Sequence, residues 1–342
     1  MLTLKAKTAS DFVTALLRVS GASPRHATVV AEHLVESSRL GLHSHGLIRV
    51  PQYLKEIREH EIDPRARPRR LRTRHAVTWV AGNACFGQVG GIYCAQRAVA
   101  LARQHGVGLV VANRLAHTGR LGAYAELIAA GDCVALIFGS GPRRGHIVAP
   151  FGGLEGRLST NPIAFAVPNG ATPIVADFAT SQLPEGKVRS ARNRGMRLPA
   201  GVLQDPLGMP TDDPAVLYGR PRGTLLPLGG LEFGHKGYAL GILVETMATL
   251  LAGDDAVDVS RPGFNLTMLA ITTPPGLSSA TARMATYMRS ARPADKRRPV
   301  LVPGDPERAA RQSDYVDVDE QSWGETETIA RELGVETPAT SR

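Results

Sequence analysis

The residues best suited to chemistry lie between positions 43 and 49, where the sequence reads HSHGLIR. Imidazole is the side chain whose pKa lies nearest neutral pH, so His45 is a candidate proton donor or acceptor. Arg49 can hold a carboxylate through two parallel hydrogen bonds, with Ser44 nearby. Such a set could protonate an oxygen and anchor an adjacent acid group. A metal site formed by His43 and His45, or a plain surface loop, are the other interpretations of this peptide alone.

A second histidine occupies a position that favours ligand binding. His117 follows an apolar run at residues 107–113 that predicts a strand, and it precedes a run with helical spacing at 119–131. Ligands of α/β proteins gather where strands end. We therefore expect His117 to face a site, while a purely structural histidine is the alternative for this position taken alone.

Small hydroxyl residues, an aspartate and a lysine form a third group of candidates. Hydroxyls, helix N-termini and lysines are typical contacts of phosphate and ribose oxygens, and Asp177 could orient an imidazole or bind ribose hydroxyls. The sequence carries neither a GxGxxG fingerprint nor a GxxxxGK[ST] loop, and the glycines between 139 and 145 have the wrong spacing. A dinucleotide would therefore be held by other means. The candidates in this group are Thr160, Asp177, Thr180, Ser181, His235 and Lys236.

Composition is that of an ordinary globular protein long enough for two lobes. The 342 residues are 43% hydrophobic and 21% charged. Cys85, Cys94 and Cys133 form no CxxC pair, which argues against a disulfide framework or a zinc site and favours the cytoplasm. The first residues lack the apolar segment of a secretory signal. The longest apolar run, 237–253, contains Glu245 and is too short to cross a bilayer, so it predicts a buried helix and no membrane partner.

Net charge raises the question of nucleic acid. The chain carries a formal charge of +9, and much of the excess lies between positions 64 and 75, in the run PRARPRRLRTRH. No aromatic residue interleaves these arginines, and no nucleic-acid-binding motif surrounds them. We interpret the run as a solvated basic loop and expect no nucleic-acid partner. Attraction of a phosphate or cofactor, and nucleic-acid binding itself, are the alternatives.

Periodicity predicts helices at the start of the chain and alternating strands and helices after position 76. Ser10 or Asp11 would cap a helix that ends at Gly21, and Ser23 with Pro24 would open the next. Alternation of this kind indicates an α/β core. The expected strands span 76–82, 107–113, 133–140, 161–168, 173–179 and 266–273. The expected helices span 12–20, 24–41, 88–104, 119–131 and 236–251, with further helix after 313.

The order of these peptides resembles the type-2 malate/L-lactate dehydrogenase family, whose fold is unrelated to that of the Rossmann-type lactate dehydrogenases. The resemblance covers residues 27–335, and HTGRLGAYAE and HKGYAL look closest to hydroxycarboxylate dehydrogenase B-like members. The matching peptides are SHG at 44–46, FGQVGG at 86–91, AHTGRLGAYAE at 116–126, APFGG at 149–153, TNPIAFAVP at 160–168, DFATS at 177–181, GK at 186–187, Asp205 with Gly208, LLPLGG at 225–230, HKGYAL at 235–240 and VPGD at 302–305.

The resemblance implies a homodimer with its active site near the subunit interface, and a non-Rossmann α/β fold in which helices flank a mixed sheet. A helical lobe would comprise 1–75 packed with 285–342, and a cofactor-binding α/β domain would span 76–284. His45 and His117 would be the acid/base candidates, and the substrate would contact Ser44, Arg49 and Thr160. The cofactor, NAD or NADP, would contact Ser140, Asp177, Ala179, Thr180, Ser181, His235, Lys236 and Gly304.

These features predict an oxidoreductase that moves a hydride between NAD(P)H and a small 2-oxo or 2-hydroxy acid such as malate or lactate, with no metal. Reduction of the C=N bond of a cyclic imino acid is the alternative within the same chemistry. A metal-dependent hydrolase with His43, His45, His117 and Asp177 as ligands is the rival from another class. His43 and Ser159 stand where relatives often carry an acidic residue and a glycine, which bears on substrate and pH optimum more than on the reaction.

Overall fold

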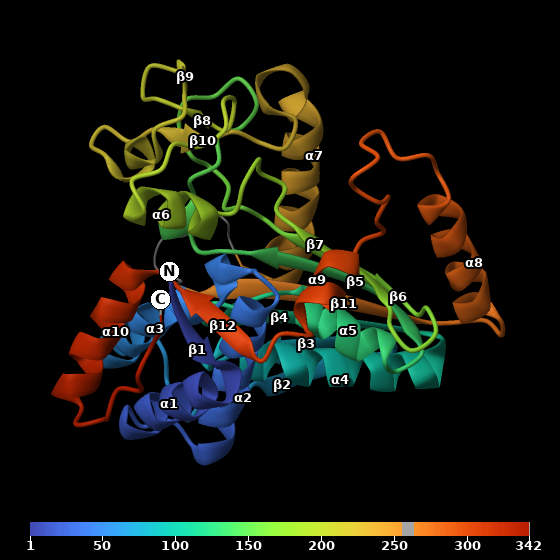
Figure 1. Cartoon of the computed structure of the whole chain (residues 1–342). Coiled ribbons are helices and arrows are strands. Elements are labelled where there is room, and N and C mark those ends of the chain that lie inside the picture. Colours follow the sequence, from blue (N-terminus) through green and yellow to red (C-terminus); the bar gives the residue numbers. More distant parts are fainter. Residues whose placement is uncertain (255–262, 342) are drawn as a thin grey trace.

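The computed structural model describes residues 1–254 and 263–341. A seven-stranded sheet in the order β2-β3-β4-β11-β5-β6-β7 runs through its centre (Figure 1). Strands β3 and β4 pair in parallel and the other neighbours pair antiparallel, so the sheet is mixed, as predicted. The strands are β2 (Arg69–Arg74), β3 (Val77–Ala81), β4 (Val107–Leu115), β5 (Cys133–Ser140), β6 (Ile163–Val167), β7 (Ile174–Phe178) and β11 (Phe264–Thr272).

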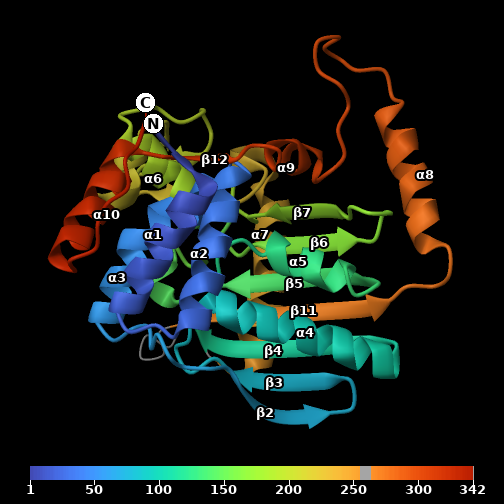
Figure 2. The ribbon, with the colours of Figure 1, turned by 60° about the horizontal axis from the view of Figure 1, so that its bottom comes forward.

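The middle strands of this sheet are apolar because helices cover both of their faces. Helices α4 (Gly87–His105) and α5 (Gly122–Ala129) lie across one face (Figure 2). Helix α7 (Gly230–Ala248) packs on the opposite face, where Val244 meets Phe138 and Ile163. The alternating strands and helices expected after position 76 thus form a two-sided core, and the prediction of an α/β fold is confirmed.

The two ends of the chain meet in a helical lobe. Helices α1 (Ala6–Val19), α2 (Pro24–Arg39), α3 (Val50–Arg58) and α10 (Glu320–Glu332) share one apolar core, in which the rings of Phe12 and Trp323 lie 5.4 Å apart. Strand β1 (Leu2–Lys5) pairs antiparallel with β12 (Tyr315–Val318), and the termini lie side by side (Figure 1). Sequence reasoning missed both strands, because each has four residues and its partner lies at the other end of the chain.

Two local predictions about helix starts had different outcomes. Ser23 caps α2 as expected, since its hydroxyl accepts a hydrogen bond from the amide of His26 at 3.2 Å. The expected cap at Ser10 or Asp11 is wrong, because α1 already begins at Ala6 and has no side-chain cap. The pairing of β1 with β12 places the helix start there and overrides the local preference.

The arginine-rich run is not a loop throughout, which corrects the expectation. Residues Arg69–Arg74 form β2, an exposed edge strand paired with β3, and the guanidinium of Arg72 lies 4.2 Å from the centre of the Trp79 ring. Charged side chains on an edge strand oppose pairing with a second sheet. The expected boundary at residue 76 would assign β2 to the helical lobe, whereas this strand belongs to the sheet of the α/β domain. The division into two domains stays a prediction.

A third, smaller region lies above the sheet in Figure 1. Ile147, Val188, Leu203, Leu217 and Leu225 form its apolar core. Its elements are α6 (Glu185–Asn193), the short strands β8 (Leu203–Gln204), β9 (Pro210–Thr211) and β10 (Thr224–Leu225), and the 3-10 helix η4 (Pro214–Tyr218). Helix α6 contacts the 3-10 turn η1 (His43–His45), and so this region closes over the histidine peptide.

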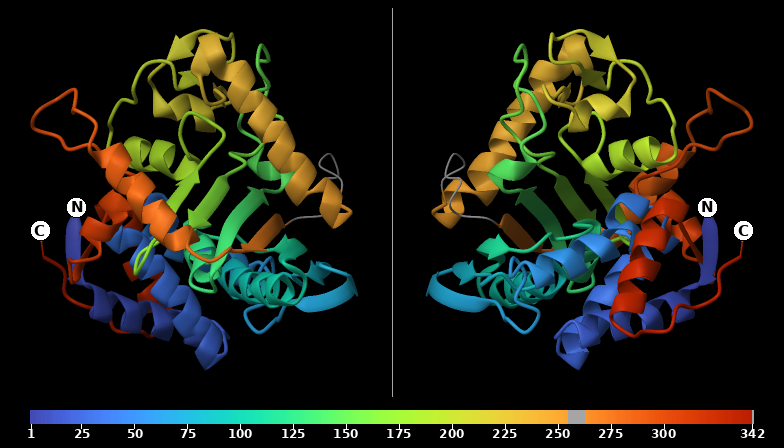
Figure 3. Two further views of the ribbon diagram at one scale, coloured as in Figure 1. Left: turned by 90° about the vertical axis from the view of Figure 1, so that its right-hand side faces the viewer. Right: turned by 90° about the vertical axis from the view of Figure 1, so that its left-hand side faces the viewer.

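The remaining segments complete the outline of the molecule. Helix α8 (Leu277–Arg289) lies at one side of the molecule in Figures 1 and 2, and the left view of Figure 3 shows it from that side. Arg289 reaches back from it to Asp305 at 2.7 Å, at the start of α9 (Asp305–Ala310). Ala285 packs with Ile174 and Val302 against the edge of the sheet, and not in the terminal lobe where the expected segment 285–342 would place it. The other 3-10 helices are η2 (Leu47–Arg49), η3 (Arg143–Gly145) and η5 (Leu250–Ala252).

Candidate active site

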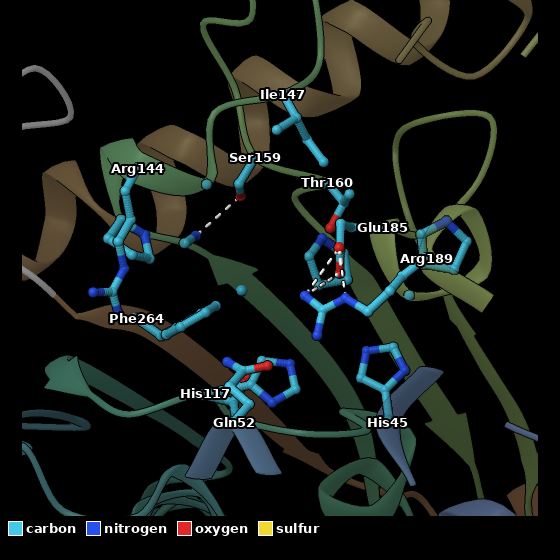
Figure 4. Close-up of a pocket in the computed structure, with 18 of the residues that line it drawn as sticks. His45, Gln52, His117, Arg144, Ile147, Ser159, Thr160, Glu185, Arg189 and Phe264 are labelled. Carbon is cyan, nitrogen blue, oxygen red and sulfur yellow. Dashed lines mark hydrogen bonds and ion pairs between the residues drawn. The ribbon is translucent and has the colours of Figure 1, made fainter. Parts of the chain in front are cut away.

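The three regions surround a cavity of about 350 Å³ that is lined by both predicted acid/base histidines (Figure 4). His45 and Arg49 enter it from the turns after α2, and His117 enters from the loop after β4. Ser140 lines it from the end of β5, and Thr160 lines it as well. The charged residues around it, in chain order, are Arg49, Glu56, Arg144, Glu185, Arg189 and Arg222.

Glycines allow the SHG peptide to lie close to its neighbours. A Cβ at Gly46 would come within 2.9 Å of the backbone nitrogen of Ser38, and a Cβ at Gly186 would come within 2.7 Å of the Cα of Ser44. Side chains at these positions would push η1 away from α2 and α6. The two glycines thus fix the turn that carries His45.

Arg49 is buried and held on three sides. Its Nε–H donates to the carbonyl of Ser44 at 2.7 Å, Nη1 donates to Gln52 Oε1 at 2.7 Å, and Nη2 donates to Glu185 Oε2 at 3.2 Å. A guanidinium has five N–H groups. Among the described residues, one N–H on each terminal nitrogen therefore has no partner, and a carboxylate can accept from this pair.

Glu185 joins the arginine side of the cavity into one network. Its carboxylate also accepts hydrogen bonds from Arg189 at 3.0 Å and from the hydroxyl of Tyr218 at 2.9 Å. Burial alone would raise the pKa of Glu185, but Arg49 and Arg189 outweigh this effect and lower it. The carboxylate therefore stays ionised and keeps Arg49 in place.

The two histidines form a parallel pair on the opposite wall. Their ring centres lie 5.7 Å apart with an angle of 15° between the planes. Ser44 Oγ is hydrogen-bonded to His45 Nδ1 at 2.9 Å, and Tyr53 Oη to His117 Nδ1 at 2.8 Å. Burial, reinforced by Arg49, lowers the pKa of His45 to about 3 and that of His117 well below its usual value. Both rings are therefore neutral at neutral pH.

The loop that carries His117 continues from this cavity to a second one. Thr118 and Gly119 line the first cavity, and Arg120 lines the second together with Asp177 and Gly304. Arg120 is buried and donates to Glu126 at 3.1 Å, while its Nε–H has no partner among the described residues. A buried donor without a partner favours an anionic or hydroxyl ligand here.

The structure does not bring Asp177 to either histidine of the first cavity. Its Oδ2 accepts a hydrogen bond from the amide of Gly122 at 2.8 Å, at the start of α5. Within the described part of the chain, the structure therefore shows no contact through which Asp177 would orient either imidazole. Contact with a ribose hydroxyl is the role that stays a prediction for this carboxylate.

The remaining cofactor candidates are dispersed. Ser140 Oγ is bonded to Thr249 Oγ1 at 2.5 Å, Thr180 donates to the carbonyl of Asn161 at 3.0 Å, and Ser181 donates to that of Leu183 at 2.8 Å. These hydroxyls hold loops together. Ala179 is half-buried beside them. His235 and Lys236 are exposed on α7, and neither lines either cavity.

Sequence reasoning missed several residues that shape the cavity. Glu185 lies in the EGK peptide, but its partner Arg49 is 136 positions away and no local spacing links the two. Gln52 follows Arg49 by one helical turn, and that spacing could have indicated it. Tyr53 contacts His117 across 64 positions, so only the folded chain shows this pair.

The alternatives left open by the sequence can be compared with the structure. Within residues 1–254 and 263–341, no three His, Cys, Asp or Glu side chains lie together as a metal site would need, so the hydrolase hypothesis gains no support from the geometry. The three cysteines are free and buried. Among the described helices, none is long and apolar enough to cross a membrane.

Comparison with known proteins identifies the family. Residues 4–325 match the model of the malate/L-lactate dehydrogenase family. The chain belongs to this family. It is 36% identical to an L-lactate dehydrogenase of Cupriavidus necator over 90% of this chain and 91% of the relative. It is 31% identical to hydroxycarboxylate dehydrogenase B of Escherichia coli over 96% and 94% of the two chains. The resemblance predicted from the peptide order is confirmed.

A solved structure in the family extends the comparison to a different reaction. The crystal structure of Δ1-piperideine-2-carboxylate reductase from Pseudomonas syringae pvar. tomato superposes with a TM-score of 0.83 and 27% sequence identity. The match covers 97% of this chain and all of the reductase. This fold therefore occurs both in hydroxy-acid dehydrogenases and in a protein named as an imino-acid reductase.

The buried neutral histidines predict a specific acid sensitivity. Burial, together with Arg120 and His45, lowers the pKa of His33 to about 3, while an unfolded histidine titrates near 6.5. Between these values the unfolded chain binds a proton that the folded chain does not. His33 therefore does not change the free energy of unfolding above pH 6.5. As the pH falls below 6.5, protonation of His33 in the unfolded chain lowers this free energy by about 1.4 kcal/mol per pH unit.

Urea unfolding between pH 6.5 and pH 5 measures this slope. His33→Gln keeps an acceptor for the amide of Arg120. It should reduce the slope of the free energy of unfolding against pH by the contribution of one proton, about 1.4 kcal/mol per pH unit. His75→Gln on the exposed β2–β3 turn should not change it. An unchanged slope in His33→Gln contradicts the assignment.

Proposed function

We propose that this enzyme transfers a hydride between NAD or NADP and a small 2-oxo or 2-hydroxy acid, such as lactate or malate, in the cytoplasm. The observation that carries the proposal is Arg49, buried and fixed, with one free N–H on each terminal nitrogen, in the cavity that also holds two stacked imidazoles. One group can hold the acid while another exchanges the proton of the neighbouring oxygen. Membership of the dehydrogenase family supports the same reaction.

The residues of the first cavity have separate tasks in this scheme. The remaining N–H groups of Arg49 bind the substrate carboxylate and so orient C2 and its oxygen. A neutral histidine takes the hydroxyl proton during oxidation, and the lowered pKa of both rings keeps them unprotonated at neutral pH before the substrate binds. In reduction, the bound carboxylate offsets the positive charge of Arg49 and makes protonation of His45 easier. The nicotinamide supplies or accepts the hydride.

The second cavity suits the phosphate or ribose part of the cofactor. Arg120 offers its unpartnered Nε–H, and Asp177 offers a carboxylate for ribose hydroxyls. The peptide from His117 to Arg120 contributes residues to both cavities, so a cofactor that reaches from one to the other would follow this peptide. The residues present therefore fit a dinucleotide, without a Rossmann fingerprint.

Reduction of a cyclic imino acid is the second candidate. Its carboxylate and its C=N bond need the same anchor, proton exchange and hydride as a 2-oxo acid. The solved piperideine-2-carboxylate reductase with the same fold favours keeping this candidate. Turnover with pyruvate, oxaloacetate and Δ1-piperideine-2-carboxylate, each with both cofactors, distinguishes the two.

A second copy of this chain is proposed to cover α7. The helix is apolar on most sides, yet Leu231, Phe233, Ile242 and Leu243 are between 45% and 55% exposed. Helix α8 adds exposed Met284, Tyr287 and Met288 on its extended arm. His235 and Lys236 share the exposed part of α7 and would approach the cofactor of the second copy.

The dimer hypothesis is tested by mass. Sedimentation equilibrium should give twice the 36.4 kDa of the chain. Phe233→Glu should shift the protein towards monomer, because it places a carboxylate in the apolar surface, while Leu207→Glu at an exposed site on the small region should not. A monomer at micromolar concentration contradicts the proposal.

The anchor is tested by Arg49→Lys. Lysine carries the charge but cannot form two parallel hydrogen bonds, so the KM for the 2-oxo acid should rise about 10- to 100-fold. The dissociation constant for reduced cofactor, from its fluorescence enhancement on binding, should stay within twofold. Arg58→Lys, exposed at the end of α3, is the control. An unchanged KM removes Arg49 from the site.

An arginine that pairs with no carboxylate among the described residues predicts which acid substrates the enzyme prefers. Four arginines and two glutamates line the first cavity, and among the described residues no carboxylate pairs with Arg222, whose Nε–H donates to the carbonyl of Leu217. This excess charge favours a second acid group on the substrate. Arg222→Ala should raise the KM for oxaloacetate about three- to fivefold and leave that for pyruvate unchanged. Arg220→Ala is the control, and equal effects on both acids contradict the idea.

A further inference from the structure

A buried chain of polar groups supports His117 from behind the cavity. Gln88 Nε2 donates to Tyr53 Oη at 2.8 Å, and Tyr53 Oη lies 2.8 Å from His117 Nδ1 and 3.3 Å from the carbonyl of the same residue. Gln88 and Tyr53 are 0% and 1% exposed. No other described side chain is hydrogen-bonded to this nitrogen of His117.

The hydrogens available along this series of hydrogen bonds determine which nitrogen of the His117 ring is protonated. The Tyr53 hydroxyl already accepts from Gln88 and has one hydrogen to give, and the nearer acceptor is His117 Nδ1. Burial raises the pKa of Tyr53 well above its usual range, so the hydroxyl keeps that hydrogen. An Nδ1 that accepts carries no hydrogen, and the neutral ring therefore carries its hydrogen on Nε2.

The orientation of the Gln88 amide supports this direction. As placed, the amide leaves its oxygen without a partner. The reverse orientation would let the tyrosine donate to the amide oxygen, but it would leave the amide N–H groups buried without an acceptor. Buried N–H groups without partners are rarer in proteins than carbonyls with unused lone pairs. Hydrogen bonds are therefore donated from Gln88 to Tyr53 and from Tyr53 to His117.

The neighbouring histidine has different surroundings. The carboxylate of Glu185 raises the pKa of His45 and partly offsets burial, whereas burial, Arg49 and His45 all lower the pKa of His117. Ser44, the partner of His45 Nδ1, can donate or accept, so it leaves both states of that ring open. Two rings with such different hydrogen-bond partners and neighbouring charges can divide acid–base work between them.

We propose that Tyr53 and Gln88 are positioning residues that hold His117 as the Nε2–H tautomer, so that His117 donates a hydrogen bond to the substrate oxygen while His45 exchanges the proton. This rests on the proposed function. During reduction, C2 gains the hydride with its electron pair and the C=O bond becomes a single bond. The oxygen then takes the proton of a His45 imidazolium, which forms once the bound carboxylate offsets the charge of Arg49. The ring becomes neutral in this step and is reprotonated from solvent. His117 neither gains nor loses a proton.

The tautomer is measured directly by NMR of protein labelled with [15N]histidine, in which long-range proton–nitrogen correlations distinguish Nε2–H from Nδ1–H rings. The signals that vanish in His117→Gln belong to His117. The expected result for wild type is the Nε2–H pattern, and for Tyr53→Phe a mixture of tautomers. An Nδ1–H pattern in wild type overturns the proposal. Because this measurement needs no substrate, it stands apart from any failure of the proposed function.

Kinetics give the second readout. Tyr53→Phe and Gln88→Met should lower kcat about 10- to 100-fold, the usual cost of losing a group that orients a functional histidine, with KM and cofactor affinity within twofold. Tyr124→Phe is the matched control, since Tyr124 is equally buried and donates to the carbonyl of Thr118 in the same loop. It should keep both the Nε2–H pattern and most of kcat. Wild-type kcat in Tyr53→Phe, or an equal loss in Tyr124→Phe, overturns the proposal.

Discussion

The contact between Arg49 and Glu185 is the constraint on which the site depends. It joins the terminal lobe to the small region across 136 positions, and both side chains are mostly buried. A buried ion pair stabilises a fold only when its hydrogen-bonding groups are satisfied. Here Ser44 and Gln52 accept from two further N–H groups of the guanidinium, and Arg189 and Tyr218 donate to the carboxylate, so each partner of the ion pair has additional hydrogen bonds.

This contact also explains the placement of the histidines. Because Arg49 is tied to the carbonyl of Ser44, the turn that carries His45 cannot move without breaking the ion pair. His117 arrives from another region, at the end of β4, where Gly87 allows close packing: a Cβ there would lie 2.3 Å from the carbonyl oxygen of His117. The two imidazoles are thus stacked by elements that share no local sequence.

Sequence reasoning succeeded where the determinants are local. Hydrophobic periodicity and the glycines that end elements predict the apolar strands after position 76 and the helix of the HTGRLGAYAE peptide. They also predict that His117 lies at the end of a strand. It failed where a partner is distant. Strand β1 depends on β12 at the other end of the chain, and the arginines of β2 concealed an edge strand because solvated arginines are equally typical of loops.

The site residues divide in the same way. His45 and Arg49 could be predicted, because imidazole and guanidinium in one short peptide already suggest proton exchange beside a carboxylate. Glu185, Tyr53 and Gln88 could not, since each acts through a residue at least 35 positions away. The sequence offered Asp177 either as a partner of an imidazole or as a ribose contact, and the structure places it against Gly122 at the second cavity.

The most direct measurement is a crystal structure of the enzyme with reduced cofactor and oxamate, an unreactive isostere of pyruvate. The account predicts the oxamate carboxylate on the two free N–H groups of Arg49, its carbonyl oxygen within hydrogen-bond distance of His45 and His117, and the nicotinamide ring beside it. A carboxylate bound away from Arg49, or a ring far from both histidines, would contradict the account.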